Sequence, residues 1–256
     1  MNLSFYTASV GAYQQQQRLD VHANNIANLN TYGFRARVPG FTALISGEVR
    51  GIDEDYQRGL GARMISDEMN LESSGMAETG RILDFAIYGS GYFMLRDSAT
   101  DQVTYTRDGS FTLMQYGPQT ENNKEFEVDN THRWYLSDGS GRFVLNSRGQ
   151  PIEFRIEKET DLAEIDFRTG DYKIGIFDWI NHDGMTSDGS NQLGPVEKNG
   201  QIGLGTGNVV QGFLELSNTD FANEMTKVIE AQRSYQMMLR MVTTSDEIET
   251  TVNSLR

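Results

Sequence analysis

The chain of 256 residues contains no cysteine at all. Disulfides and thiolate metal sites are therefore excluded, and cysteine usage leaves the compartment open. Long apolar runs are also missing, since no stretch approaches the roughly 18 residues that cross a bilayer. Residues 1–20 lack the basic start and the continuous apolar run of a cleavable secretory signal, so we expect neither membrane insertion nor export by the usual secretory route.

Basic residues are in deficit. Lys and Arg number 22 against 36 Asp and Glu, which gives a formal net charge of −14. A chain without a basic stripe cannot displace the counterions of a polyanion. Nucleic acid and anionic membranes are therefore poor partners, and the acidic, glycine-rich, proline-poor composition is typical of a soluble chain.

Signatures of metal and cofactor chemistry are lacking. His22, His132 and His182 lie in three different segments, and no His-Glu-x-x-His spacing occurs. The glycine-rich residues 203–207 lead into a β-like pair that starts at Val209, not into a helix whose N-terminus could hold a phosphate. The 36 acids allow many carboxylate pairs, and nothing singles one out. We expect no metal, no cofactor and no enzymatic activity.

What the chain does have is a long amphipathic pattern at its C-terminal end. From Phe221 onward, mostly apolar residues recur every three or four positions for about 36 residues without proline or glycine, which predicts one helix. Ser217 and Asp220 have the spacing of a capping box just before it. The helix would be roughly 54 Å long, more than a compact domain covers, so it needs a partner. The stripe consists of Phe221, Met225, Val228, Gln232, Tyr235, Met238, Val242, Ser245, Ile248, Val252 and Leu255.

A second stripe occupies the N-terminal end and is the natural partner. Two such stripes predict a coiled-coil hairpin of residues 1–35 and 215–256. Because several members are polar where a stable isolated coiled coil has Leu or Ile, two interpretations stay open: the helices pack on their own globular core, or they complete their packing only against other copies. The N-terminal stripe consists of Phe5, Ala8, Ala12, Gln15, Leu19, His22, Ile26 and Leu29.

An asparagine-rich stretch marks the exit of the first helix. Asn24, Asn25, Asn28 and Asn30 lie within seven positions, and Gly33 follows. Asparagine is a poor helix-interior residue but a good capping and turn residue, and glycine suits the left-handed conformation beyond a helix end. We therefore predict an ordered helix exit at these five residues.

The middle of the chain has a different character. Residues 36–80, with scattered glycines and a short acidic run, predict an extended connector that contains one hairpin at most. Residues 81–214 show short runs of period two around Asp108-Gly109 and Asp138-Gly139, which are strong hairpin signals. This pattern predicts an antiparallel all-β domain, with a longer strand from Tyr172 to Ile180 and a surface insertion at 115–130. The fold class is therefore α+β.

Four segments, taken in order, resemble the bacterial flagellar rod and hook proteins. The helix exit from His22 to Arg35 is similar to the family's asparagine-rich N-terminal signature, and residues 212–236 are similar to its C-terminal signature. Residues 83–93 and 105–111 resemble strands of the rod branch. The length fits a distal or proximal rod protein better than the larger hook protein, and the motifs leave the choice between those two open.

The resemblance implies an axial subunit of the flagellar basal-body rod, lying outside the cytoplasmic membrane and exported through the flagellar type III export apparatus. Its partners would be other copies of itself and neighbouring rod and hook proteins, and its role would be to transmit motor torque to the hook. Terminal helices of many copies would form an inner tube, with the β domains as the outer wall. The polymerisation residues would be Phe5, Ala8, Ala12, Leu19, Ile26, Leu29, Phe221, Met225, Val228, Tyr235, Met238, Val242, Ile248, Val252 and Leu255.

A carbohydrate-binding or hydrolytic β domain on a helical stalk is the alternative. It would need a cleft with convergent carboxylates and aromatics, for which Trp134, Tyr135 and Trp179 are candidates, although each alternates as a core residue would. An export chaperone or cap protein of the same organelle is disfavoured, because the rod-type β motifs are present.

Overall fold

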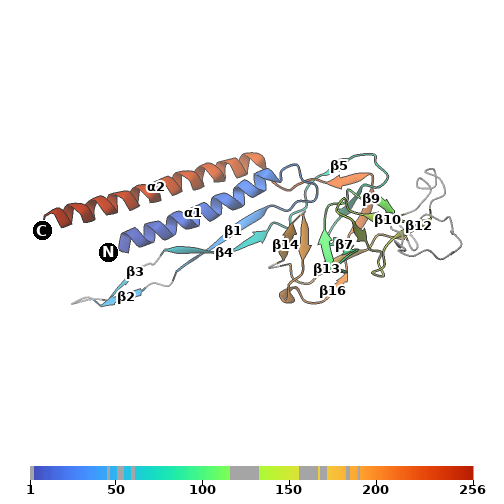
Figure 1. The fold of residues 1–256 in the computed structure, drawn as a ribbon, viewed down its shortest axis with the longest axis horizontal. Helices are drawn as coiled ribbons and strands as arrows, with labels where there is room; N and C mark the ends of the chain where they lie inside the picture. Colours follow the sequence, from blue (N-terminus) through green and yellow to red (C-terminus); the bar gives the residue numbers. More distant parts are fainter. Residues whose placement is uncertain are drawn as a thin grey trace, which may run out of the picture. The chain divides into compact units, whose positions relative to one another are not determined.

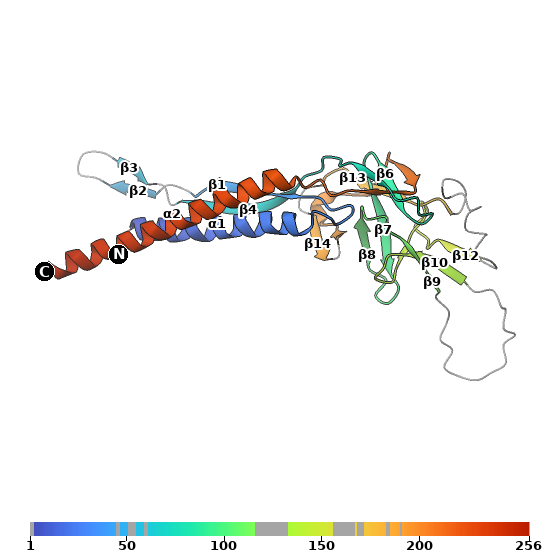
Figure 2. The ribbon, with the colours of Figure 1, turned by 90° about the horizontal axis from the view of Figure 1, so that it is seen from above.

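The computed structural model describes residues 3–44, 47–50, 55–58, 61–115, 133–155, 167, 172–182, 185–189 and 191–255 (Figures 1 and 2). The chain divides into two compact units. The first, here called the helical unit, contains Met1–Leu29, Arg35–Leu71 and Thr219–Arg256. The second, the β unit, contains Asn30–Phe34 and Glu72–Asn218.

Two helices from opposite ends of the chain lie side by side in the helical unit (Figures 1 and 2). They are α1, Leu3–Ala27, and α2, Phe221–Ser254. Their contacts show that they run antiparallel, because the start of α1 meets the far part of α2, and the end of α1 meets the start of α2. Neither helix in the described part of the chain combines the length and apolar character needed to cross a membrane.

A β ribbon completes the helical unit. Strands β1, Arg37–Ala43, and β4, Ala62–Met69, pair antiparallel with a bulge after Gly40, and β2, Gly47–Arg50, pairs with β3, Asp55–Arg58. Segment 36–80, expected as an extended connector, therefore carries paired strands, and up to Leu71 it belongs to the helical unit. Sequence alternation is weak here because most residues of both strands are exposed, so neither face has to be apolar. On that face, Oε1 of Gln14 accepts a hydrogen bond from the Met64 N–H at 2.5 Å.

The β unit is built from antiparallel pairs, and these together with the two helices confirm the α+β class. In the described residues its largest sheet has ten strands, with the central order β12-β10-β11-β7-β8-β15-β14. Separate pairs are β17 with β6 and β18 with β5. The strands are β5 Met76–Glu78, β6 Phe85–Tyr88, β7 Tyr92–Asp97, β8 Val103–Thr106, β9 Thr112–Gln115, β10 Arg133–Ser137, β11 Arg142–Val144, β12 Glu153–Arg155, β13 Ile176–Trp179, β14 Thr186–Gly189, β15 Gln192–Gly194, β16 Ile202–Leu204, β17 Asn208–Gln211 and β18 Phe213–Glu215.

Phenylalanine dominates the core of the β unit. Phe93 and Phe111 meet edge to face with ring centroids 5.2 Å apart, and Phe85 and Phe167 do the same at 5.0 Å. Such quadrupole-matched contacts add to the free energy gained by burying the rings. The core forms because alternate positions of the short strands are apolar and point to one side.

Three local expectations need correction. Strands β8 and β9, which lie on either side of the predicted hairpin turn at Asp108-Gly109, pair with other strands and not with each other. The predicted strand from Tyr172 to Ile180 is shorter and spans only Ile176–Trp179. The start of α2 is capped by Asp220 itself, not by a capping box headed by Ser217: Oδ1 of Asp220 accepts hydrogen bonds from the N–H groups of Ala222 at 3.0 Å and Asn223 at 3.4 Å. The physical reason is that an N-cap side chain serves the second and third helical residues, so it must directly precede the helix. The predicted insertion at 115–130 lies outside the described residues except for Gln115, which ends β9.

Candidate assembly interface

The facing sides of α1 and α2 hold part of the predicted polymerisation set. Ala8 and Ala12 are buried, and Gly11 lies where an added Cβ would come within 3.2 Å of Sδ of Met238, so small residues let the helices approach closely. The partly buried members are Phe5, Leu19, Ile26, Leu29, Val228, Tyr235, Met238 and Val242. These residues lie within one chain, so at least part of the stripe is used for intramolecular packing.

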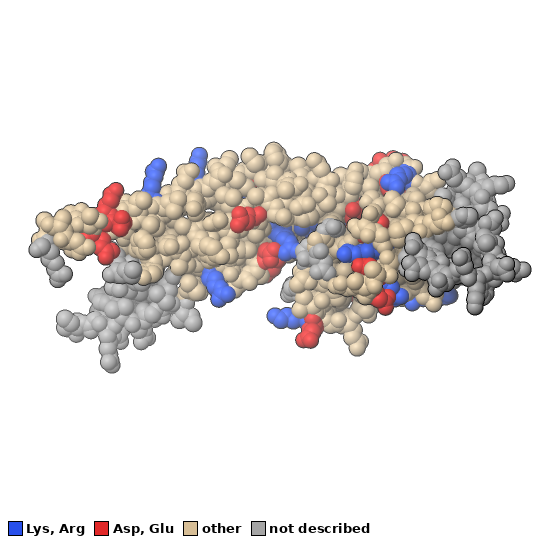
Figure 3. All heavy atoms as spheres, in the orientation of Figure 1, with Lys and Arg blue, Asp and Glu red and all other residues tan. Residues whose placement is uncertain are grey.

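The remaining predicted residues are exposed along α2. They are Phe221, Met225, Ile248, Val252 and Leu255. Further large apolar side chains that the stripe did not include are also exposed: Ile229, Met237, Leu239 and Met241. The predicted stripe follows one side of the helix, and these four residues lie on other sides of it. In the face shown in Figure 3, charged side chains are sparse over much of α1 and α2.

The end of α2 carries three of these exposed residues, among them Leu255, the most exposed of all. The hydroxyl of Ser245 lies 3.4 Å from that of Ser4, near the start of α1 at Leu3, whereas α2 continues to Ser254. Ile248, Val252 and Leu255 follow this contact and are 52%, 58% and 84% exposed. These three residues, here called the α2 overhang, therefore extend beyond the described part of α1. Their spacing of four and three places them on one side of the helix.

A buried polar cluster joins the end of α1 to the beginning of α2. Nδ1 of His22 lies 2.7 Å from Oε2 of Glu224, and Nδ2 of Asn25 donates to the same oxygen at 3.1 Å. Nζ of Lys227 donates to the other oxygen, Oε1, at 2.9 Å. His22, Asn25 and Glu224 are all buried. Burial alone raises the pKa of Glu224, but the hydrogen bonds from Lys227, Asn25 and His22 outweigh it and hold the pKa below its ordinary value.

Asn25 also ties α1 to the ribbon. Its side-chain amide donates to the Arg37 carbonyl at 2.8 Å and accepts from the Arg37 N–H at 2.9 Å, so it pairs with the backbone of β1 as another strand would. The sequence predicted only a helix-exit role for Asn25. Its position on the buried side of the stripe, next to His22, was the available signal for a contact with α2.

The other members of the predicted exit motif act locally. Nδ2 of Asn28 donates to the Asn24 carbonyl at 2.9 Å within the last turn, whereas Asn30 is exposed. Gly33 has a φ of +65° and its N–H donates to the Glu215 carbonyl at 2.7 Å within the β unit. An added Cβ at Gly33 would lie 2.4 Å from the carbonyl carbon of Arg107. Only glycine fits both the left-handed conformation and this close approach.

Arg107, whose backbone lies close to Gly33, forms a buried ion pair with Glu215. Nη1 of Arg107 lies 3.1 Å from Oε2 of Glu215, and its Nη2 donates to the Gly89 carbonyl at 2.8 Å. The guanidinium also lies over the ring of Tyr92, 5.3 Å from its centroid. A planar fork of donors suits such a site better than a lysine would. The pair fixes the strand turn after β8 and is structural in its surroundings.

The two tryptophans that the carbohydrate-binding alternative requires pack inside the β unit. Trp179 is buried, with its ring 4.4 Å from that of Tyr105 and 5.4 Å from that of Tyr92, and Trp134 packs against the phenylalanine core. In the part of the chain that the structure describes, no group of three or more His, Asp or Glu side chains is placed to hold a metal ion.

Comparison with known proteins connects the two ends of the chain. The family model described as "Flagella basal body rod protein" matches residues 5–35, and "Flagellar basal body rod FlgEFG protein C-terminal" matches residues 210–255. The flagellar basal-body rod protein FlgG of Bacillus subtilis (strain 168) is 34% identical over 271 residues, covering 96% of each chain. The chain belongs to the flagellar basal-body rod protein family.

Other members of the rod family and its complex are similar along nearly the whole length. The flagellar hook-basal body complex protein FlhP of Bacillus subtilis (strain 168) is 28% identical over 273 residues, covering 99% of each chain. The flagellar basal-body rod protein FlgF of Caulobacter vibrioides is 27% identical over 236 residues, covering 91% of this chain and 89% of that protein. The family expected from the motifs is thereby confirmed. His22 and Asn25 lie in one matched end and Glu224 in the other, so the buried cluster joins the two segments that the rod-family models match.

Proposed function

We propose that this chain is a structural axial subunit of the bacterial flagellar basal-body rod. Its terminal helices pair as a coiled coil and polymerise with those of other copies into a shaft that transmits motor torque to the hook. The role requires no catalysis and no cofactor. Neighbouring rod and hook proteins are its further partners, and the flagellar type III export apparatus carries it across the cytoplasmic membrane.

The observation that carries this proposal is the exposed apolar side of α2. A monomeric soluble protein rarely leaves a contiguous apolar surface uncovered, and a helix with apolar residues on several faces is normally buried. The α2 overhang has no described part of α1 opposite it, and its last residue, Leu255, is therefore 84% exposed. Such a surface favours coverage by another chain.

Paired packing of the two helices supports the coiled-coil part of the proposal. Seven of the nine buried and partly buried residues of α2 recur at intervals of three and four, as the contact face of a coiled coil does. They are Glu224, Val228, Ala231, Tyr235, Met238, Val242 and Ser245, and Lys227 and Ser234 flank this series. We propose that residues 1–35 and 215–256 form the axial domain and that residues 81–214 face outward; segment 36–80 carries the ribbon of β1 and β4.

The proposed shaft is an open polymer and not a closed dimer. An apolar end that docks on a different surface of the next copy makes a heterologous contact, and a heterologous contact that does not close on itself builds a helical filament. A rod is such a filament. The expected location is the basal body, outside the cytoplasmic membrane.

Replacement of Ile248 and Val252 together by Asp tests the proposal in the full chain. Polymerisation is followed by sedimentation and electron microscopy of the purified protein, and rod completion by imaging basal bodies of cells that carry the variant. We expect loss of polymer with unchanged helix content. The matched control, Thr243→Asp with Thr250→Asp, adds the same charges to the same end of α2 but on a different side of the helix. Normal polymers from the Ile248 and Val252 variant would refute the role of the overhang.

A further inference from the structure

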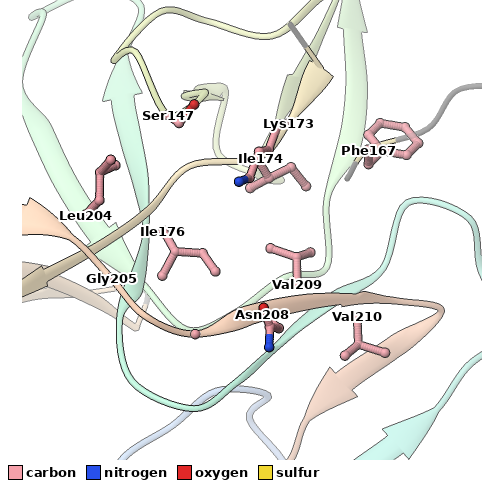
Figure 4. A pocket seen from close by; sticks show the side chains of 11 residues that line it. Ser147, Phe167, Lys173, Ile174, Ile176, Leu204, Gly205, Asn208, Val209 and Val210 are labelled. Atoms are coloured by element: carbon pink, nitrogen blue, oxygen red, sulfur yellow. The ribbon is translucent and has the colours of Figure 1, made fainter. Parts of the chain in front are cut away.

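A pocket of about 530 Å³ opens in the β unit (Figure 4). Its apolar walls include Ile174, Ile176 of β13 and Val209 of β17. The two isoleucines are 1% and 8% exposed and belong to the phenylalanine-rich core, against which Val209 packs. The pocket therefore reaches the core, and its volume lies within the range of sites that hold a small molecule.

Three polar side chains accompany these apolar walls: Ser147, Lys173 and Asn208. In the part of the chain that the structure describes, none of the three side chains makes a hydrogen bond or an ion pair. Lys173 is the one charged residue among the described lining residues. A mostly apolar pocket with a few polar groups that lack partners is how sites for small molecules are usually built.

The glycine-rich residues 203–207 line the same pocket but do not form a phosphate cradle. Gly205 and Gly207 belong to the lining, yet their N–H groups donate to the carbonyls of Ile176 at 2.9 Å and Ser90 at 3.1 Å. A phosphate cradle requires backbone N–H groups that are free to point at the ligand. An anionic group in this pocket therefore has to rely on a side chain and not on the glycine-rich backbone.

We propose that this pocket binds a small molecule that combines an apolar chain with a carboxylate, such as a medium-chain fatty acid. The apolar chain lies against Ile174, Ile176 and Val209, and the carboxylate accepts a hydrogen bond from the amine of Lys173. Burial of the chain supplies most of the affinity, and the charge-assisted hydrogen bond sets which end of the ligand faces solvent. The site uses no residue of α1 or α2, so the inference does not depend on polymerisation.

The charge of the whole chain makes ligand charge a stringent criterion. A formal net charge of −14 repels carboxylates and attracts amines at long range. At physiological ionic strength such effects are screened beyond roughly 8 Å, whereas direct contact with the amine of Lys173 is not. A preference for a carboxylate over an amine of the same chain length therefore requires a basic group at the site, and Lys173 is that group among the described lining residues.

Isothermal titration calorimetry of the unpolymerised full chain with hexanoate, octanoate, decanoate and decylamine tests the ligand class. We expect the affinity to rise about fourfold for each CH₂ group that becomes buried, and decanoate to bind more tightly than decylamine. Lys173→Gln should weaken decanoate binding about threefold. The matched control is Lys198→Gln, which changes an exposed lysine of the same unit outside the pocket and should leave the affinity unchanged. Absence of decanoate binding, a preference for decylamine or an unchanged affinity in Lys173→Gln would overturn the proposal.

The absence of cysteine permits a test of where the ligand binds. Leu204 lines the pocket and is 66% exposed, so Leu204→Cys retains the fold and places a thiol at the pocket. The full chain carrying this change is labelled with a maleimide with and without saturating decanoate, and Ser98→Cys, on an exposed turn of the same unit, is the matched control. We expect decanoate to slow labelling several-fold at residue 204 and not at residue 98. An unchanged rate at residue 204 would place the ligand elsewhere, for example on the exposed side of α2, and would overturn the proposal.

Discussion

Nδ1 of His22 lies 2.7 Å from Oε2 of Glu224, although 202 positions separate the two residues in the chain. The pair is buried where α1 ends and α2 begins, and Asn25 connects it to β1. Buried charges are costly unless they are paired and hydrogen-bonded, so this cluster fixes which turn of α1 faces which turn of α2. Polar residues that weaken an apolar stripe can thus specify its register.

Glu224→Gln removes the negative charge of the carboxylate that both His22 and Lys227 contact. Because only one terminal atom of a glutamine amide can accept hydrogen bonds, one donor of the buried cluster is left unpaired, and we expect the free energy of unfolding to fall by about 2 kcal/mol, measured by urea denaturation. Hydrogen exchange should increase at the end of α1. The matched control is Glu230→Gln, whose carboxylate is 62% exposed and lies 3.8 Å from Arg18 across the same helix pair. The control should lower the free energy of unfolding by about 0.5 kcal/mol or less. Equal losses from both variants would contradict the stabilising role of the buried cluster.

Stability should also depend on pH through Glu224. Its pKa is lower in the folded chain than in the unfolded chain, because its hydrogen bonds outweigh the opposing effect of burial. A carboxyl group of this kind contributes stability above its unfolded pKa of about 4.3, and that contribution is lost as the pH falls through the lower folded pKa. Urea denaturation at a series of pH values should therefore show a decline at acid pH that is shallower in Glu224→Gln. If stability declined equally with falling pH in the unmodified chain and in Glu224→Gln, Glu224 would not be the source of the pH dependence.

Gly33→Ala should destabilise the β unit more than its backbone angle alone implies. Gly80 has nearly the same φ, +66° against +65°, but no atom lies within 4 Å of its added Cβ. Gly80→Ala should therefore cost only the left-handed penalty of about 1 kcal/mol. Gly33→Ala should cost about 3 kcal/mol, because the backbone of Arg107 and Asp108 must also shift. Thermal unfolding of the two variants gives the comparison, and similar costs would show that the close approach is relieved without strain.

Asp220→Ala should remove the N-cap of α2. The expected loss is about 1 kcal/mol, with faster hydrogen exchange at the Ala222 and Asn223 amides that Oδ1 accepts from. Asp220→Asn keeps an acceptor oxygen in the same place, so it should retain most of the stability. If Asp220→Ala left the exchange of both amides unchanged, the capping role would have to lie elsewhere.

Local features of the chain were predictable to different degrees. The limits of α2 followed from its periodicity, because the spacing of apolar residues along a helix is a local property of the sequence. The hairpin turn at Asp138-Gly139 followed from turn chemistry, and β10 and β11 flank it. For segment 36–80 the sequence predicted one hairpin at most, and it did not show that β1 and β4 pair, because these strands are far apart in the chain and mostly exposed. Ser217 was assigned as the cap because a spacing pattern does not show which residue directly precedes the helix.

By itself the sequence determined the amphipathic ends, the short antiparallel strands and the family, since each is carried by neighbouring residues or by a motif. The tertiary structure alone decided what the polar interruptions of the stripes do: His22 and Asn25 meet Glu224 in a buried cluster, because antiparallel packing brings opposite ends of the chain together. It also decided that Ala8 and Ala12 are covered within the chain while Ile248, Val252 and Leu255 are not. The reason is geometric: a sequence pattern shows that a face is apolar, but only the relative lengths and register of α1 and α2 show which part of that face another helix covers.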